Sequence, residues 1–467
     1  MEQVYHLQSR WKVEGRSLYY YGLRNKENLF RNRVRLSARQ TEIIAALPKA
    51  LTQTEKNALG DLLGEQIVPV EALRSVPTSL ADAKFCTTCC ANDFIIPGLE
   101  FDTDGRCPLC QTADAVRGLR SLVPIVEDIP PAKDSRFDAA LFYTGGKDST
   151  YLLYYLSKVK KLRILALTWE IPFMSDSARK SIENAKKCFD NVEFISHCVN
   201  RNALKRFYSK LYDLSENTCA CPSLAYLLFY PTLVENRVPY FLAGNEPAQI
   251  LGLYYNHIAP RIAYSFPENK ALTFLYNVGR VLTLQPPLKQ GQIQTLMTMK
   301  QLAYGNNAVQ KASGYTNELV THIVEAIHAL PELLPPLKRS IRRSSWTGHV
   351  PAFVHFDFDT IAGGTYDWNQ VKDILRRECG WVSPADDQKA LHTSCAIEKC
   401  KDHSQFLRFY HCRSKMIPFS SLEISLASRN CGRSREETLY EMEHLLGCTL
   451  DAPAECAIMR EFIGDTK

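Results

Sequence analysis

Apolar positions in the middle of the chain form short continuous runs that alternate with longer segments of helical spacing. The run Ala139–Tyr143 has the length and the unbroken apolar character of a strand inside a parallel sheet. Similar strands are expected at Arg163–Glu170, Val192–Ile195 and Tyr240–Ala243, with helices between them at Ser177–Lys187, Arg201–Leu214 and Ser223–Asn236. Strands that alternate with helices predict an α/β fold with a doubly wound parallel sheet.

The segments on either side of this unit follow different patterns. Residues 1–83 predict an introductory α+β domain with helices at Ala38–Leu47 and Gln53–Leu63, and residues 261–467 predict a mostly helical region. That region includes helical stretches at Gln294–Tyr304 and Asn317–Leu330, and a break at Pro335-Pro336. The first domain carries a basic cluster that we interpret as a solvated face, with contact to an RNA or a nucleotide-linked sugar as the alternative: Arg24, Lys26, Arg31, Arg33 and Arg35.

Composition narrows the class of protein. The 467 residues suffice for two to four domains, and the net charge of +6 permits an anionic substrate without demanding nucleic acid. No apolar run is long enough to span a membrane and the start does not resemble a signal peptide, so we expect a cytoplasmic protein without membrane insertion. In that compartment the 16 cysteines favour thiols and metal ligands over disulfides.

The stretch Thr144–Ser149 follows the first strand and opens a helix. Its glycines, Gly145 and Gly146, allow positive φ angles and close approach of a ligand to the backbone. A strand that enters a helix through glycines aims backbone N–H groups and the helix dipole at one point, which suits a phosphate. The spacing is neither that of Walker A, because Leu141 and Asp148 stand where glycine and Ser/Thr are needed, nor that of G-x-G-x-x-G.

Two C-x-x-C pairs, Cys86/Cys89 and Cys107/Cys110, lie before this loop with 17 residues between them. That spacing is typical of a structural zinc site with four thiolate ligands, and predicts a zinc ribbon over residues 84–114. Cys219 and Cys221 form a C-x-C pair for which two interpretations stay open: half-buried residues near the site, or ligands and sulfur carriers. A further group, His392, Cys395, Cys400 and His403, is interpreted as solvated helix residues rather than as a second metal site.

The loop Thr144–Ser149 resembles the Ser-Gly-Gly-x-Asp-Ser loop of the PP-loop ATP pyrophosphatases, which belong to the HUP superfamily. The ribbon, with Pro97-Gly98 and Phe101-Asp102 between its knuckles, resembles the N-acetyl sugar amidotransferases of surface-glycan biosynthesis. So do Tyr366-Asp367-Trp368, Gly380-Trp381 and the stretch Ala427–Glu437.

The resemblance implies a Rossmann-like ATP-binding domain over residues 130–260 that cleaves ATP to AMP and pyrophosphate with Mg²⁺. Catalytic roles would fall to Lys147, at the leaving pyrophosphate, and Asp148, at Mg²⁺. The loop residues Thr144, Gly145, Gly146 and Ser149 would bind the phosphates. Thr168, Trp169 and Glu170 would contact the adenosine, and Gly244, Asn245 and Glu246 would lie at the ligand edge of the sheet.

The resemblance favours an amidotransferase in which a carbonyl of a sugar or nucleotide-sugar is adenylated and its oxygen replaced by ammonia-derived nitrogen. The chain shows no glutaminase of its own, so a glutaminase subunit or free ammonia would supply the nitrogen. The alternative is thiolation of tRNA or a small metabolite with Cys219 and Cys221 in the sulfur step, which would allow an iron–sulfur cluster. The sequence does not decide whether the protein forms a homodimer.

Overall fold

The computed structural model describes residues 3–29, 31–117, 124–216, 220–259, 270–305 and 317–464. A five-stranded parallel sheet forms its centre, in the order β11-β10-β7-β8-β9. Its strands are β7 (Ala139–Phe142), β8 (Ile164–Trp169), β9 (Val192–His197), β10 (Tyr240–Ala243) and β11 (Ala352–Phe353). The predicted doubly wound α/β sheet is therefore confirmed. Since β11 comes from residues 352–353, the sheet extends beyond the range 130–260 predicted for the ATP-binding domain.

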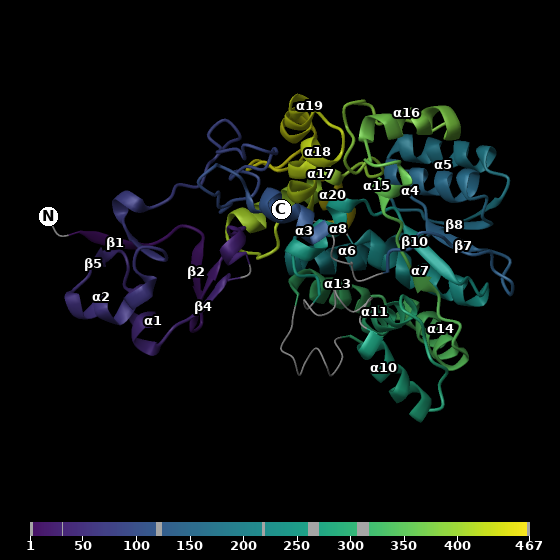
Figure 1. Cartoon of the computed structure of the whole chain (residues 1–467), viewed down its shortest axis with the longest axis horizontal. Coiled ribbons are helices and arrows are strands. Elements are labelled where there is room, and N and C mark those ends of the chain that lie inside the picture. The colour runs from purple at the N-terminus through teal and green to yellow at the C-terminus, as the bar shows by residue number, and fades with distance from the viewer. Residues whose placement is uncertain are drawn as a thin grey trace.

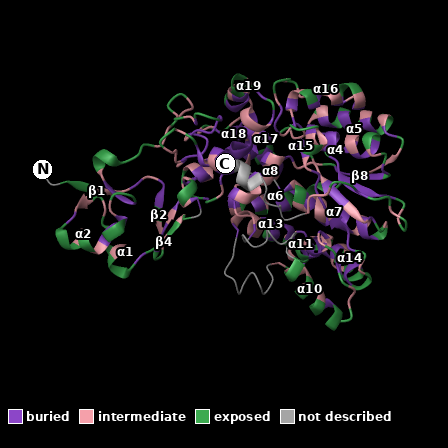
Figure 2. Ribbon diagram, in the orientation of Figure 1, coloured by how far each residue is buried: buried purple, intermediate pink, exposed green. Residues whose placement is uncertain are grey.

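Helices cover both faces of this sheet (Figure 1). Successive residues of β7 point to opposite faces, so Ala139 and Leu141 pack in one apolar core while Ala140 and Phe142 pack in another. The first core includes residues of α4 (Lys147–Tyr154), α5 (Asp176–Cys188) and α16 (Trp368–Cys379), and the second includes residues of α6 (Arg201–Ser215), α7 (Cys221–Glu235) and α14 (Leu334–Thr347). Figure 2 shows β8 as buried, and all residues of β7 are buried as well, whereas the edge strand β9 is only partly buried.

The N-terminal part forms a separate lobe on the left of Figure 1. It holds two small antiparallel sheets and a core of its own. Arg10 of this lobe is buried, and its guanidinium group donates hydrogen bonds to the carbonyl oxygens of Phe409 at 2.7 Å and Tyr410 at 2.6 Å. The lobe consists of β1 (Val4–Leu7), β2 (Trp11–Glu14), β3 (Ser17–Tyr20), β4 (Arg33–Arg35), α1 (Ala38–Ala45), β5 (Lys49–Ala50), α2 (Gln53–Leu59) and β6 (Ile67–Pro69). The basic cluster is solvated as predicted except for Arg24, which is buried and paired with Glu65 and Glu100.

The remaining helices belong mainly to the C-terminal region, which is mostly helical as predicted. They are α3 (Pro108–Arg117), α8 (Pro247–Tyr255), α10 (Lys270–Leu282), α11 (Gln292–Tyr304), α13 (Glu318–His328), α15 (Phe358–Ile361), α17 (Glu398–Tyr410), α18 (Phe419–Asn430), α19 (Arg435–Tyr440) and α20 (Glu455–Ile463). The break predicted at Pro335-Pro336 is wrong, because α14 begins there. A proline has no N–H to lose in a first helical turn, so it fits a helix start. Among the described residues, no helix is both long and apolar enough to cross a membrane.

Candidate functional site

The loop after β7 has the geometry that its glycines predict. Gly145 has φ +70°, and a Cβ atom at this position would lie 2.4 Å from the carbonyl oxygen of Ala178. Gly146 is the N-cap of α4, which begins at Lys147. The first N–H groups of a helix have no partner within the helix, and together with the dipole they favour an anion at this point. The loop therefore provides a fitting site for a phosphate group.

Segments of the C-terminal region hold this loop in place. The backbone N–H of Lys147 donates to Thr393 Oγ1 at 2.9 Å, and Trp381 Nε1 donates to the carbonyl oxygen of Gly145 at 3.1 Å. Within the loop, the hydroxyls of Thr144 and Ser149 lie 3.1 Å apart. The shape of the loop thus depends on residues more than 200 positions away, which the sequence pattern could not indicate.

The end of β10 packs directly against the start of α4. A Cβ atom at Gly244 would lie 2.5 Å from the backbone nitrogen of Ser149, so no residue with a side chain fits without displacing the helix. Glu246, two residues later, is the N-cap residue of α8, but its side chain makes no capping hydrogen bond. The carboxyl edge of β10 therefore lies against the loop, as the sequence predicts.

We expect Gly244→Ala to lower the free energy of unfolding by about 1–3 kcal/mol, the usual cost of overpacking, and, by displacing α4, to weaken the ATP binding that the sequence analysis expects at this loop. Urea unfolding and titration with α,β-methylene-ATP measure the two effects. Gly279→Ala is a suitable control, because Gly279 lies within α10 with nothing within 4 Å of its added Cβ. A Gly244→Ala variant as stable as the control would contradict this packing.

Lys147 is enclosed rather than solvated. Its side chain is 1% exposed, it pairs with Asp148, and its Nζ lies 4.7 Å from the ring centre of Tyr366 and 4.8 Å from that of Trp368. Both rings attract the ammonium through their electron-rich faces. The hydroxyl of Tyr366 also donates to Asp148 Oδ1 at 2.8 Å, and burial, with Asp148 beside it, raises the pKa of this phenol well above its ordinary value, so it stays a donor.

Glu246 lies beside this group. Trp368 Nε1 donates to Glu246 Oε2 at 2.8 Å, whereas Oε1 is buried and has no hydrogen-bond partner among the described residues. Burial raises the pKa of Glu246 to about 8, and the nearby Lys147 only partly offsets this rise. The site therefore holds a carboxyl group that titrates near neutral pH and has one free oxygen.

The site is bordered by three further side chains of the C-terminal region, those of Cys431, His392 and Glu423. The thiol of Cys431 lies 3.9 Å from Glu246 Oε2, and burial followed by repulsion from Glu246 raises its pKa well above the ordinary value, so it stays protonated. His392 Nε2 lies 2.8 Å from Glu423 Oε2. Burial alone would lower the pKa of His392, but Glu423 and Glu398 raise it to about 9, so the imidazole is charged at neutral pH.

The sequence analysis assigned no role to Tyr366, Trp368 or Cys431, although all three lie in the C-terminal stretches that resemble the amidotransferases. The resemblance of those stretches is the one sequence feature that could have indicated these three residues. The structure adds that they meet Lys147, Asp148 and Glu246 at the sheet edge.

The residues expected at the adenosine follow β8 or end it. Thr168 is buried and its hydroxyl donates to the carbonyl of Tyr143 at 2.9 Å, which ties β8 to the start of the loop. Trp169 is buried on the opposite face with its Nε1 unpartnered in the described structure, and Glu170 Oε2 accepts a bond from the exposed Cys198 at 3.7 Å. Asn245 Nδ2 donates to Gln249 at 3.3 Å. Their contacts with adenosine remain predictions.

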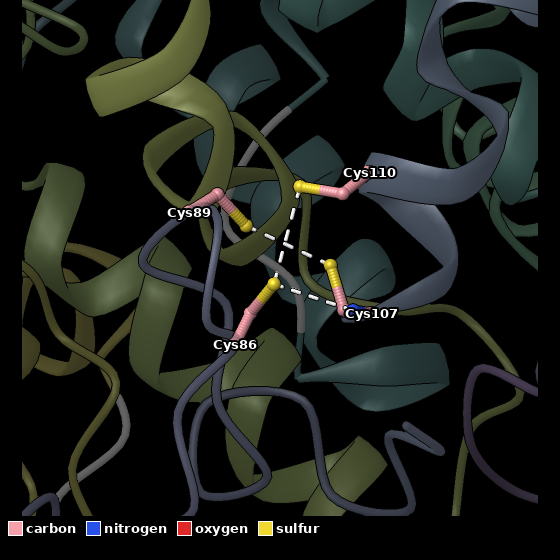
Figure 3. A group of neighbouring side chains, drawn as sticks. All are labelled: Cys86, Cys89, Cys107 and Cys110. Atoms are coloured by element: carbon pink, nitrogen blue, oxygen red, sulfur yellow. Dashed lines mark hydrogen bonds between the residues drawn. The ribbon is translucent and has the colours of Figure 1, made fainter. Parts of the chain in front are cut away.

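Cys86, Cys89, Cys107 and Cys110 converge as the spacing predicts, with all four sulfurs within 4.8 Å of one another (Figure 3). The separation is 3.6 Å between Cys89 and Cys107 and 3.9 Å between Cys86 and Cys110. A tetrahedral zinc with Zn–S bonds of 2.3 Å needs sulfurs about 3.8 Å apart. Backbone N–H groups of Thr88 and Cys107 also donate to Cys86 Sγ, as expected at a thiolate. The four side chains thus fit a single zinc ion better than a cluster, whose thiolates bind separate irons further apart.

The other cysteines are less clearly grouped. Cys219 lies outside the described residues, and Cys221 is half-buried at the start of α7. Because Asn236, just after α7, accepts a bond from Ser135 before β7, α7 ends at the amino edge of the sheet. Its 15 residues span about 22 Å, so Cys221 lies toward the carboxyl edge.

The interpretation of His392, Cys395, Cys400 and His403 as solvated helix residues is wrong. Cys400 and His403 lie on α17 but are buried, while His392 and Cys395 lie in the half-buried segment before it. His403 Nδ1 is 2.9 Å from the carbonyl of Thr449. In the described part of the chain, the ribbon cysteines are the set that brings three or more potential ligand atoms together, so the group offers no second metal site there.

Comparisons with known proteins identify no relative that shows the family of this chain. No protein-family model matches the chain, and no curated protein matches it. Among solved structures, the chain is similar to the U34-tRNA thiolase NcsA from Methanococcus maripaludis with its [4Fe-4S] cluster, at 14% identity and a TM-score of 0.23, over 57% of this chain and 88% of that one. At that level of similarity the match supports neither a fold nor a function.

Proposed function

We propose that the chain is an AMP-forming ATP pyrophosphatase that adenylates a carbonyl oxygen and then replaces that oxygen with nitrogen. The observation that carries the proposal is the glycine loop at the sheet edge, with α4 behind it and the carboxylates of Asp148 and Glu246 beside it. The resemblance of Thr144–Ser149 to the PP-loop supports cleavage between the α- and β-phosphates.

In this proposal the residues divide the work by position. The start of α4 and the hydroxyls of Thr144 and Ser149 bind the phosphates, and Asp148 holds Mg²⁺, which offsets charge on the leaving pyrophosphate. Tyr366 orients Asp148 through its hydrogen bond, and Lys147, held between two rings, keeps its charge fixed near the reacting phosphate. Positioning and electrostatics supply most of the rate enhancement.

The experiment that tests this function is product analysis. With α-labelled ATP, Mg²⁺, ammonium chloride and a small-molecule extract of the source cells as acceptor pool, we expect AMP and pyrophosphate. Chromatography that shows ADP and phosphate would refute the proposal, because an enzyme that cleaves the β–γ bond needs a different loop chemistry.

Thiolation remains the second candidate, since the direction of α7 places Cys221 toward the carboxyl edge. A sulfur carrier must be an activated thiolate, whereas a nitrogen nucleophile needs neither cysteine. We therefore expect the Cys219→Ser, Cys221→Ser double variant to form AMP and to incorporate ¹⁵N from labelled ammonium at close to the wild-type rate. A variant that binds ATP but makes no product, beside a wild type that incorporates ³⁵S, would favour thiolation.

A further inference from the structure

The protein provides a hydrogen-bond donor to only one of the two carboxyl oxygens of Glu246. Its side chain is 1% exposed, and Oε2 accepts the hydrogen bond from Trp368 Nε1. Oε1 is equally buried but has no partner among the described residues. A buried oxygen without a partner is costly, and such a group at a functional site calls for a ligand that would complete it. A purely structural role, in which Glu246 anchors Trp368, explains Oε2 but leaves Oε1 without a function.

The charges around this oxygen favour a particular ligand. Besides burial, the carboxyl groups of Asp148 and Glu423 raise the pKa of Glu246, whereas the ammonium of Lys147 lowers it. Lys147 is already shared between Asp148 and the two aromatic rings. Above pH 8, where Glu246 is ionised, a ligand at Oε1 should therefore be a hydrogen-bond donor that is cationic or neutral, and an anion such as hydrosulfide would be repelled.

The size of the ligand is limited as well. Since Glu246 is 1% exposed and Trp368 is fully buried, we expect only a small ligand at Oε1, and ammonium is about as large as a water molecule. Burial raises the pKa of Glu246 to about 8, so above that pH the group is a carboxylate that can hold ammonium and accept its proton.

We propose that Glu246 Oε1 is the binding site of the nitrogen nucleophile, held as ammonium, and the group that accepts its proton. This inference deepens the proposed function and rests on it. It names ammonium as the second substrate and gives the residue at the end of β10 a chemical role distinct from ATP binding.

The step balances as follows. Ammonium gives one proton to Glu246 Oε1 and becomes ammonia, whose lone pair forms a C–N bond with the adenylated carbon. The C–O bond to AMP breaks, and its electron pair leaves with AMP. The product carries the positive charge of the new nitrogen, and Glu246 releases its proton to solvent before the next cycle.

The test measures binding rather than turnover, so it needs no acceptor. Above pH 8, where Glu246 is ionised, wild-type protein is saturated with Mg²⁺ and α,β-methylene-ATP, and its unfolding temperature is followed during titration with ammonium chloride at constant ionic strength. Potassium chloride and sodium hydrosulfide serve as matched titrations. We expect a saturable rise with ammonium, a much smaller one with potassium and none with hydrosulfide. In Glu246→Gln, the half-saturating ammonium concentration should rise at least tenfold while the affinity for the ATP analogue stays unchanged.

Two variants keep the test decisive. Trp368→Phe removes the donor to Oε2 but keeps Oε1, and should shift the half-saturating concentration less than Glu246→Gln does, even if the latter folds poorly. Glu183→Gln, at an exposed position on α5, controls for the loss of one charge and should have no effect. An equal response to potassium would overturn the proposal, because it would show a general monovalent-cation site. A wild type that ignores ammonium or saturates with hydrosulfide would overturn it as well. Formation of ADP in the product analysis would instead refute the proposed function itself.

Discussion

Replacing Asp148 by Ala is expected to lower the rate of AMP formation about a hundredfold or more, the scale for the loss of one preorganised charged contact. The change removes the proposed Mg²⁺ ligand and leaves Lys147 and the hydroxyl of Tyr366 without their shared acceptor. Lys147→Ala should have an effect of similar size, because it leaves buried carboxyl groups without their cation. Labelled ATP and chromatography of the nucleotides measure both rates.

The control for this series is Asp134→Ala, since Asp134 is exposed in the segment before β7. A Tyr366→Phe variant separates metal binding from orientation: it keeps the carboxylate, so it should raise the Mg²⁺ concentration needed for half-maximal rate more than it lowers the maximal rate. If Asp148→Ala turned over at the wild-type rate, the loop would not be the site of ATP cleavage.

Cys107→Ser is expected to reduce the zinc content from one ion per chain to nearly none and to lower the unfolding temperature by several degrees. Its sulfur lies 3.6 Å from that of Cys89 within the group of four, and binding of a structural zinc contributes directly to folding. Elemental analysis and thermal unfolding measure the two effects.

Cys90→Ser is a closely matched control for the ribbon. Cys90 is also buried and adjoins Cys89, but its thiol donates to Ser428 at 3.4 Å rather than joining the four sulfurs. It should keep its zinc. An unchanged metal content in Cys107→Ser would reject the ribbon as the zinc site.

The parts of the fold that the sequence predicts are those that depend on neighbouring residues. The strand at Tyr240–Ala243 has the predicted bounds, and the other predicted strands and helices around the sheet differ by at most two residues at either end. The loop glycines and the two C-x-x-C pairs are equally local patterns. Each is set by backbone geometry or ligand spacing within a few residues.

The parts that could not be predicted depend on contacts between distant segments. Tyr366 and Trp368 enclose Lys147 because α16 packs against α4, and no periodicity in either helix indicates this pairing. Likewise, Cys400 and His403 were expected to be solvated, whereas α17 packs against α20 and accepts a hydrogen bond from Ser420 of α18 at Asp402. The aromatic residues at the site and the polar residues on α17 therefore needed the structure.

The bond from Lys147 to Thr393 has a consequence for the synthesis of the protein. The two residues are 246 positions apart. A ribosome that adds about 5–20 residues per second needs roughly 12–50 s to pass from one to the other. During that time the nascent chain already exposes the glycine loop but lacks the hydroxyl that fixes it and the rings that enclose Lys147. The loop can therefore take the shape described here only once Thr393 has left the ribosome.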